Sequence, residues 1–452
     1  RLPPGEWLKG GSWGSDFFAR EAIDDPRAWL DAVLPDHPAF LSDDSAHDAW
    51  INARAMQWLG IDADTPDPAG GHFERDAAGR PTGILRETAM RRIRERIPGY
   101  TPAQVREAMA RVSARLNAVG ITGARNAGLY PDMIDAHRRQ GRGAGFSVHF
   151  GVSIRTPYGP RDIPLDIARI DRLARRATAP NVDARFVKIF LDGVPTPART
   201  AAMLEPYLTD ARHPAPTRGE LFLDMENLAV DLINLDAAGY SVKLHTAGDR
   251  AVRTALDAIA QMRQVNGFSG RYVELAHAGF VAAADIPRFA ALDAVADFSP
   301  ALWYPSNIID AIVSVTGERG RRYFPTRAFL DSGALVIAGS DWPSVGETPS
   351  PWAGIETLVT RAHPEGRKPG TLWPGQAITL AEAVRIYTLN GARALRLGHM
   401  TGTITKGKYA DFIVLDRDLF AVPIEEVSES RDLETWFMGT RVWPAVSGGA
   451  GG

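Results

Sequence analysis

Short apolar runs alternate with helical segments from about residue 116 onward, and this alternation constrains the fold more than any other feature of the sequence. It is the pattern of βα units, which build a parallel sheet. Helical spacing of apolar residues occurs, for example, at residues 249–265 and 282–292. A closed (β/α)8 barrel has eight strands, so we expect one strand to lie before Arg1. The seven others are predicted at residues 120–125, 146–154, 186–191, 241–245, 272–277, 294–299 and 334–339.

Two flanking regions break this rhythm. Residues 1–100 are rich in Pro, Asp and Gly, and we expect them to form a cap or inserted subdomain before the barrel at 101–398. Residues 399–443 contain strand-like runs and are interpreted as the C-terminal part of a small β-sandwich-like domain. Residues 444–452 end in glycines and are predicted to be a flexible tail. The predicted fold class is therefore α/β, a (β/α)8 TIM barrel with a small β-domain and a cap.

The composition excludes several kinds of function. The chain has 51 Lys and Arg against 54 Asp and Glu, so it offers no basic field for nucleic acid or anionic lipid. It has no apolar run long enough to predict a membrane span. It contains no cysteine, which excludes a disulfide frame, a thiolate nucleophile and a Cys-based zinc site. We therefore expect a small-molecule substrate, and any bound metal must be held by nitrogen and oxygen ligands.

Polar side chains occur where four of the predicted strands end. Lys188 lies in the run "RFVKIFLDG", His245 and His277 end two later strands, and Asp341 follows the last one. Because the carboxyl ends of barrel strands converge on one cavity, we expect these four side chains to meet there. Imidazole and carboxylate are suitable ligands for Zn²⁺ or a similar divalent ion. Asp341 could also take a proton from a metal-bound water and pass it to a leaving amine.

Each of these residues also has an ordinary structural interpretation. A single strand histidine is more often a core residue than a ligand, and Asp341 could be a helix N-cap. Lys188 could be an edge residue that extends its ammonium into water. If Lys188 lies beside a metal, its amine must be neutral or carry a carbamate that bridges two ions, because a cation would be repelled. The combination of the four residues is what favours a metal site.

These residues lie within longer stretches by which the chain resembles the amidohydrolase superfamily and, within it, amidohydrolase family 3, the YtcJ-like metal-dependent hydrolases. The resemblance covers nearly the whole chain. It implies that Lys188 is the fourth-strand lysine, usually carboxylated, and that His245 and His277 are the fifth- and sixth-strand ligands. It also implies that Asp341 is the eighth-strand acid and base. The matching stretches include "VKIFLDG" (187–193), "HTAGDRAVRTALDAI" (245–259), "ELAHAGFVAAADIPRFAAL" (274–292) and "FLDSGALVIAGSDWP" (329–343).

One departure from the family pattern concerns the first strand. Family members end that strand with a His-x-His pair that holds the more buried metal, whereas no two of the ten histidines here are two residues apart. The amino-terminal half of the β-domain is also missing. We therefore expect a segment of about 100 residues before Arg1, since seven strands do not close the barrel. A separate N-terminal fragment that completes the barrel is one way to supply it.

The predicted function is hydrolysis of a non-peptide C–N bond in a small amide, N-acyl or carbamate-like molecule. A metal-activated hydroxide would attack the carbonyl, Asp341 would move the proton, and His277 or a neighbour would stabilise the oxyanion. The expected cofactor is a divalent metal, with Zn²⁺ as the leading candidate and one or two ions bound. Two alternatives stay open: a catalytically inactive binding or regulatory barrel, and an esterase or lactonase that uses the same metal site.

Substrate-binding residues are predicted from aromatic and polar side chains near the expected cavity. Packing inside the cap or the barrel is the alternative for each of them. A homodimer is a further expectation. We expect a cytoplasmic protein, while a periplasmic or secreted location stays open because the chain begins with Arg1 rather than Met. The candidate substrate-binding residues are His47, Trp50, Arg199, Trp303 and Trp342.

Overall fold

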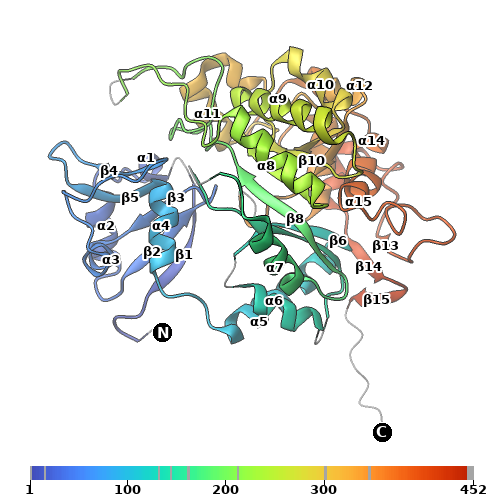
Figure 1. The fold of residues 1–452 in the computed structure, drawn as a ribbon, viewed down its shortest axis with the longest axis horizontal. Coiled ribbons are helices and arrows are strands. Elements are labelled where there is room, and N and C mark those ends of the chain that lie inside the picture. Colours follow the sequence, from blue (N-terminus) through green and yellow to red (C-terminus); the bar gives the residue numbers. More distant parts are fainter. Residues whose placement is uncertain are drawn as a thin grey trace, which may run out of the picture.

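The computed structural model divides the chain into three parts that follow one another in sequence: an N-terminal cap, a barrel sheet with surrounding helices, and a small C-terminal sheet (Figure 1). The predicted flexible tail lies outside the described residues except for Pro444. The described residues are 3–14, 17–130, 133–142, 145–159, 163–210, 213–299, 303–344 and 348–444.

A seven-stranded parallel sheet forms the barrel wall. All seven strands predicted from the sequence are present, and each pairs in parallel with its neighbours. Within the described part of the chain, β6 and β12 are the two edges of this sheet and no strand joins them. In spatial order the strands are β12 (Leu335–Ala338), β11 (Ala294–Phe298), β10 (Val273–His277), β9 (Ser241–Thr246), β8 (Val182–Phe190), β7 (His149–Arg155) and β6 (Gly123–Leu129).

Helices between the strands cover the outer face of this sheet (Figure 1). The helix predicted at 249–265 is α9 (Asp249–Asn266), and the segment 282–292 is a 3-10 turn followed by α10 (Ile286–Ala291). None of the described helices combines the length and the apolar character that a membrane span needs. The remaining helices of this part are α5 (Pro102–Asn117), α6 (Ile134–Arg142), α7 (Ile167–Ala177), α8 (Met225–Ala237), α11 (Asn307–Thr316), α12 (Thr326–Asp331), α13 (Pro351–Thr360), α14 (Leu380–Arg385) and α15 (Gly391–Ala394).

Burial of one helix face explains how the helices hold the sheet. Val252, Leu256 and Ile259 of α9 are fully buried, and their spacing of three and four residues places them on one face of the helix. Strand β7 is buried along almost its whole length, as expected for a parallel sheet that is covered on its faces. Side-chain caps fix where helices begin: Asp224 accepts a hydrogen bond from the backbone N–H of Asn227 at the start of α8.

The cap is a five-stranded sheet with its own helices, which the Pro-, Asp- and Gly-rich sequence did not reveal. Two small apolar clusters form its core, one around Ile51 and Leu85 and one around Leu30 and Trp50. In spatial order its strands are β1 (Leu8–Trp13), β2 (Ala39–Asp43), β3 (Asp48–Ile51), β5 (Pro81–Glu87) and β4 (Gly71–Arg75). Its helices are α1 (Phe17–Arg20), α2 (Pro26–Val33), α3 (Ala53–Leu59) and α4 (Thr88–Arg96).

Three antiparallel strands form the C-terminal sheet, which packs against the start of the barrel strands. His149, the first residue of β7, contacts the carboxylate of Asp411 at 2.9 Å. Thr435 Oγ1 donates a hydrogen bond to the carbonyl of Asn117 at 2.7 Å. His149 is therefore tied to this small sheet, at the opposite end of its strand from the expected cavity. The strands are β13 (Phe412–Leu415), β14 (Asp432–Phe437) and β15 (Thr440–Trp443).

Trp50 is the largest side chain in the core of the cap. It is 2% exposed, its indole donates a hydrogen bond to the carbonyl of Pro26, and its ring lies 4.9 Å from that of Phe18. We expect Trp50→Ala to lower the free energy of unfolding by about 3–5 kcal/mol, because it leaves a large cavity. Urea denaturation followed by tryptophan fluorescence measures this. Trp58→Ala is the matched control: Trp58 is 54% exposed, so its loss should cost less than about 1 kcal/mol.

A buried histidine of α6 makes the stability of the barrel dependent on pH. His137 is 3% exposed, its ring lies 4.9 Å from that of Phe146, and its Nδ1 has no hydrogen-bond partner among the described residues. Burial lowers the pKa of His137 from 6.5 to about 4. Protonation of His137 therefore favours the unfolded chain. The free energy of unfolding is highest above pH 6.5 and decreases as the pH falls toward 4.

We expect this histidine alone to reduce the free energy of unfolding by about 3 kcal/mol over that range. Urea denaturation at several pH values measures the effect. In His137→Leu, the free energy of unfolding should fall by about 3 kcal/mol less than in the parent between pH 6.5 and 4. A variant that keeps the full acid dependence of the parent would show that His137 is not its source. His37→Leu in the cap is the matched histidine control.

Candidate active site

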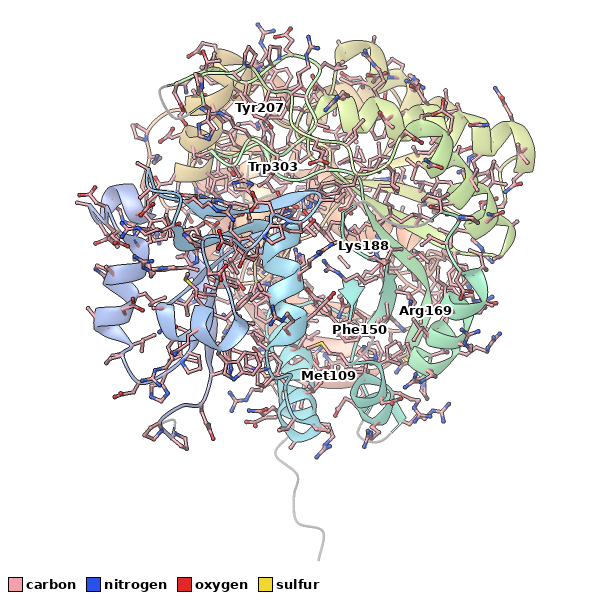
Figure 2. The ribbon with its side chains drawn as sticks, turned by 60° about the vertical axis from the view of Figure 1, so that its left-hand side comes forward. Met109, Phe150, Arg169, Lys188, Tyr207 and Trp303 are labelled. Atoms are coloured by element: carbon pink, nitrogen blue, oxygen red, sulfur yellow. The ribbon has the colours of Figure 1, made fainter. Side chains whose placement is uncertain are left out.

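Three neighbouring strands and the loop after a fourth, β12, carry the four predicted site residues. Lys188 lies on β8, His245 on β9 and His277 at the end of β10. The rings of His245 and His277 are 4.7 Å apart, and Nδ1 of His277 lies 4.0 Å from the carboxylate of Asp341. Lys188 is buried in the barrel (Figure 2), and its Nζ lies 4.9 Å from the ring centre of Phe190, whose ring is 5.7 Å from that of His245. These side chains surround one volume at the carboxyl ends of the strands.

The position of His277 depends on a break in strand geometry. Side chains alternate between the two faces of a strand, and Ala276 is the residue in register with His245. Regular alternation would therefore point His277 to the opposite face. Instead His277 has a φ of 72°, and Asp341 has a φ of 53°. Such backbone conformations are uncommon for residues with side chains and cluster at functional sites, and here they accompany the approach of both side chains to His245.

A backbone hydrogen bond fixes the tautomer of His245. Its Nε2 lies 3.0 Å from the carbonyl of Gly193, which can only accept, so Nε2 carries the hydrogen. Burial, followed by the charges of His277 and His47, holds the pKa of His245 well below its ordinary value. The ring is therefore neutral, and its Nδ1 has a free lone pair that faces away from Gly193. This is the second-sphere arrangement that is typical of a metal-binding imidazole.

Burial shifts the pKa of the other three residues as well. It lowers the pKa of His277 well below its ordinary value, and the nearby Lys188 and Lys243 lower it further. Burial raises the pKa of Asp341, although these two lysines oppose the shift. The Asp341 side chain is nevertheless 38% exposed, so the carboxylate is reached from the mouth of the barrel while protein surrounds its other sides.

Two buried ion pairs lie in the barrel interior below the site. Lys243 Nζ is 2.5 Å from the carboxylate of Asp297, and Arg125 on β6 pairs with Glu274 on β10. None of these four residues was predicted from the sequence, although alternation along β9 places Lys243 on the same face as His245 two positions later. The two opposite charges of each pair compensate one another. A single ion without a partner would be strongly unfavourable in this desolvated interior.

Asp192 organises the loops around His245. It is fully buried and accepts hydrogen bonds from the backbone N–H groups of Ala202, Ala247 and Gly248 at 2.9–3.0 Å. One of its oxygens also lies 3.8 Å from Nε2 of His245. Burial raises the pKa of Asp192 to about 7, and the three backbone donors act against that rise. This carboxylate therefore joins the loop after β8 to the start of α9.

The cap adds a second cluster of polar groups beside His245. His47, in the loop between β2 and β3, places its ring 4.9 Å from that of His245. Its Nδ1 donates to the carboxylate of Glu87 at 2.7 Å, and Glu87 also accepts hydrogen bonds from Tyr158 and Thr200 of the barrel. His47 was predicted from the sequence as a substrate-binding residue, whereas Glu87 was not, because nothing in the local sequence marks the residue that β3–β5 pairing places opposite His47.

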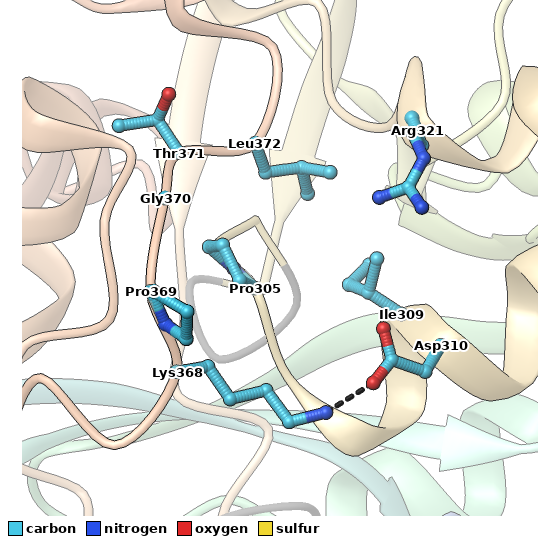
Figure 3. Close-up of a pocket in the computed structure, with 9 residues that line it drawn as sticks. All are labelled: Pro305, Ile309, Asp310, Arg321, Lys368, Pro369, Gly370, Thr371 and Leu372. Atoms are coloured by element: carbon cyan, nitrogen blue, oxygen red, sulfur yellow. Dashed lines mark hydrogen bonds and ion pairs between the residues drawn. The ribbon is translucent and has the colours of Figure 1, made fainter.

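Two cavities lie near this end of the molecule. One of about 210 Å³ lies beside Glu87, between the cap and the barrel. Its lining consists of Gly70, Gly71, His72, Glu87, Thr200, Glu220 and Phe222. The other, of about 500 Å³, lies among loops after β11 and α13 and contains an ion pair between Lys368 and Asp310 (Figure 3). None of the four strand-end residues lines this larger pocket.

The other predicted substrate-binding residues are placed differently. Trp50 is packed inside the cap, and Trp303 is fully buried with its indole donating to Thr357, so the structure puts neither at the surface of the cavity. Both are corrections: aromatic size identified them, but apolar packing holds them. Arg199 is buried and its guanidinium is engaged by Asp210 at 2.5 Å. Trp342 follows Asp341 and is half-buried.

The donor atoms around the site match a divalent ion in chemical type. They are the free Nδ1 of His245, the Nε2 of His277, the carboxylate of Asp341 and the amine of Lys188. Among the residues that the structure describes, however, no three His, Cys, Asp or Glu side chains are close enough together to hold a metal. These residues therefore provide suitable ligands but not a complete coordination sphere.

Comparison with known proteins assigns the chain to a family. The profile of the amidohydrolase family matches residues 1–443. The chain belongs to this family. The membership predicted from the sequence is thereby confirmed, and so is the enzyme class, a hydrolase of the amidohydrolase type that acts on C–N bonds.

Individual relatives agree with this assignment. The N-substituted formamide deformylase of Arthrobacter pascens is 28% identical over 448 residues, which cover 97% of this chain and 79% of that protein. The putative amidohydrolase YtcJ of Bacillus subtilis is 29% identical over 426 residues, covering 93% and 77%. A metal-dependent hydrolase structure from Pyrococcus horikoshii, 22% identical, superposes with a TM-score of 0.68 over 93% of this chain and 79% of that one. This superposition confirms the predicted barrel fold.

The charge of Lys243 should control the protonation of Lys188. Burial and the adjacent Lys243 lower the pKa of Lys188 to about 7. We expect Lys243→Met to raise that pKa, because it removes a neighbouring cation and leaves the negative charge of Asp297 unpaired. NMR titration of ¹³C-labelled lysine measures it, with Lys188→Met to assign the resonance. The exposed Lys406→Met is the control, and an equal pKa in both variants would contradict the coupling.

Proposed function

We propose that this amidohydrolase hydrolyses an amide, N-acyl or carbamate-like C–N bond of a small molecule at the site formed by Lys188, His245, His277 and Asp341. The observation that carries the proposal is the approach of the accessible Asp341 carboxylate to His277, whose ring packs against the ring of His245 from the neighbouring strand. The name of the Arthrobacter relative, an N-substituted formamide deformylase, supports a substituted amide as the first substrate to try.

A divalent metal, with Zn²⁺ as the first candidate, completes this proposal. His245 would bind it through Nδ1 and His277 through Nε2, with Asp341 and a carboxylated Lys188 as further oxygen ligands for one or two ions. When bound, such an ion polarises the substrate carbonyl and lowers the pKa of the attacking water. The lowered pKa of Lys188 supports the carbamate, because only a neutral amine reacts with CO₂.

Asp341 is the group that moves the proton. It takes a proton from water as the water oxygen bonds to the carbonyl carbon, and it gives that proton to the nitrogen as the C–N bond breaks. The raised pKa of Asp341 suits this exchange, because a carboxyl with an ordinary pKa holds the proton too weakly to return it. His277, 4.0 Å from this carboxylate, adjoins the position where negative charge develops on the carbonyl oxygen.

One observation favours a second candidate function, a catalytically inactive binding or regulatory barrel. No three of the described His, Cys, Asp and Glu side chains lie close enough together to hold a metal. A binder of this kind would take up the small molecule without cleaving it. It would also copurify without a stoichiometric divalent ion, so metal analysis separates it from the hydrolase.

The test combines metal analysis with a substrate panel. Native mass spectrometry and elemental analysis should find at least one divalent ion per chain, and a panel of N-substituted formamides, esters and lactones should show C–N cleavage. Asp341→Asn should keep the fold and the metal but lower kcat by roughly a hundredfold or more. Asp331→Asn, at a 64% exposed side chain, is the matched control. Full turnover in Asp341→Asn would contradict the role of Asp341, and faster ester cleavage would favour an esterase.

A further inference from the structure

Three arginines converge on one tyrosine ring where the cap meets the barrel, and we call Arg91, Arg94 and Arg155 the arginine cluster. Arg91 and Arg94 lie on α4 of the cap, and Arg155 is the last residue of β7. The guanidinium carbons of Arg94 and Arg155 lie 4.6 and 4.8 Å from the ring centre of Tyr130. Arg91 Nη1 donates a hydrogen bond to the hydroxyl of the same tyrosine at 3.1 Å. Tyr130 directly follows β6, so the cluster lies at the carboxyl ends of the barrel strands.

No carboxylate offsets this positive charge in the part of the chain that the structure describes. None of the three guanidinium groups forms an ion pair there, and Arg155 donates no hydrogen bond. Nη2 of Arg155 and Nε of Arg91 are nevertheless buried. Buried N–H groups of a cation are costly when nothing accepts from them, and neighbouring cations repel each other. An anion that accepts these hydrogen bonds removes both costs.

The pKa values of Arg155 and Tyr130 respond to this charge. Burial lowers the pKa of Arg155 to about 10, and the neighbouring Arg91 and Arg94 add to the shift. Burial alone would raise the pKa of Tyr130, but the charges of the three arginines and the hydrogen bond from Arg91 hold it below its ordinary value. Arg155 is therefore still a cation at neutral pH, and Tyr130 lies in a local excess of positive charge.

Stacking on aromatic rings does not by itself explain the cluster. A ring face stabilises a cation, but it does not replace an anion as the acceptor for the N–H groups of a guanidinium. The arginine cluster lacks an anionic partner among the described residues. Other arginines that lie over phenylalanine rings are paired with carboxylates: Arg125 with Glu274, Arg263 with Asp236 and Arg396 with Asp183.

The cluster is open to solvent and adjoins the candidate active site. Arg94, Tyr130 and Arg155 are each partly exposed, so a small anion can reach them. Phe190 ends β8, the strand between β7 and β9. Its ring centre lies 4.5 Å from the guanidinium carbon of Arg155 and 5.7 Å from the ring of His245. A single aromatic side chain therefore contacts both the cluster and the site.

We propose that the arginine cluster binds the oxyanion of a small molecule, a carboxylate or a phosphate. Guanidinium groups bind such anions through paired N–H···O hydrogen bonds, which a single ammonium group does not provide. The site itself does not depend on the proposed function. The assignment of the anion to the substrate does rest on it, and it narrows the substrate class to amides whose substituent carries a carboxylate or a phosphate.

The first test measures anion binding and needs no substrate. Inorganic phosphate should shift the Nε–H signals of Arg91 and Arg155 in ¹⁵N-arginine spectra of the full chain, whereas sodium chloride at equal ionic strength should not. Bound phosphate should also raise the pKa of Tyr130, because its charge offsets that of the arginines. Titration of ¹³C-labelled tyrosine measures this pKa, with Tyr130→Phe to assign the resonance. Signals and a pKa that phosphate leaves unchanged would overturn the proposal.

Arginine variants show whether the cluster is the binding site. Arg155→Met should weaken phosphate binding, followed at Tyr130, by about tenfold to a hundredfold, because hydrogen bonds to a charged group are lost. Arg155→Lys keeps the charge without the paired donors and should lie between the two. If Arg155→Met does not fold, Arg94→Met, at a partly exposed residue, should show the loss. Arg175→Met, at a 73% exposed side chain, is the matched control. Phosphate affinity equal to that of the parent in the cluster variants would contradict the site.

A pair of substrates decides where the anion comes from. N-formyl-γ-aminobutyrate and N-butylformamide differ only in the carboxylate at the end of the same alkyl chain. If the anion belongs to the substrate, the parent should favour the first by about tenfold or more in kcat/KM, and Arg155→Met should lose this preference. Equal rates, with phosphate bound as expected, would support the site and assign it to a separate anion. No cleavage of either, with phosphate bound as expected, would instead contradict the proposed function.

Discussion

Parallel pairing of β8, β9 and β10 is the constraint on which the site depends. Their register places Lys188 beside Lys243 and leaves His245 at the carboxyl end of the next strand. Regular alternation would send His277 to the other face, and the positive φ at that residue accompanies the approach of its ring to 4.7 Å from that of His245. The site therefore depends on two features: the parallel register of the strands, and the irregular backbone conformation of His277 at the end of β10.

Burial shifts the pKa of each site residue, and the charged groups of the barrel interior modify those shifts. Burial favours neutral forms, and the pair formed by Lys243 and Asp297 supplies charge of both signs two residues below His245. The histidines are therefore neutral and able to bind a cation, while Lys188 loses its proton more easily than a lysine in water does. An apolar lumen of the same shape would keep the imidazoles neutral as well, but it would hold no second cation to depress the pKa of Lys188.

The sequence predicted what is local and missed what depends on docking. Strand patterning located all seven strands and the strand-end residues His245 and His277, because βα periodicity and topology are written in consecutive residues. Trp50 and Trp303 were predicted to line the substrate cavity, but both are buried in apolar packing. The sequence does not show whether an aromatic ring faces a cavity or the core. Glu87 was missed because its role arises only when a cap strand ends opposite His47 and the cap meets the barrel. Whether the predicted metal ligands can meet around one ion likewise depends on the relative positions of separate strand ends, which the spacing of residues in the sequence does not fix.

Docking of the cap onto the barrel runs through one buried carboxylate. The same carboxylate, Glu87, accepts hydrogen bonds from His47 of the cap and from Tyr158 and Thr200 of the barrel, so the cap cannot shift without loosening the ring beside His245. The cavity of about 210 Å³ is lined by Glu87 together with residues of the cap and of the barrel. Any group that binds beside Glu87 is limited in size by this cavity, which the cap and the barrel line together.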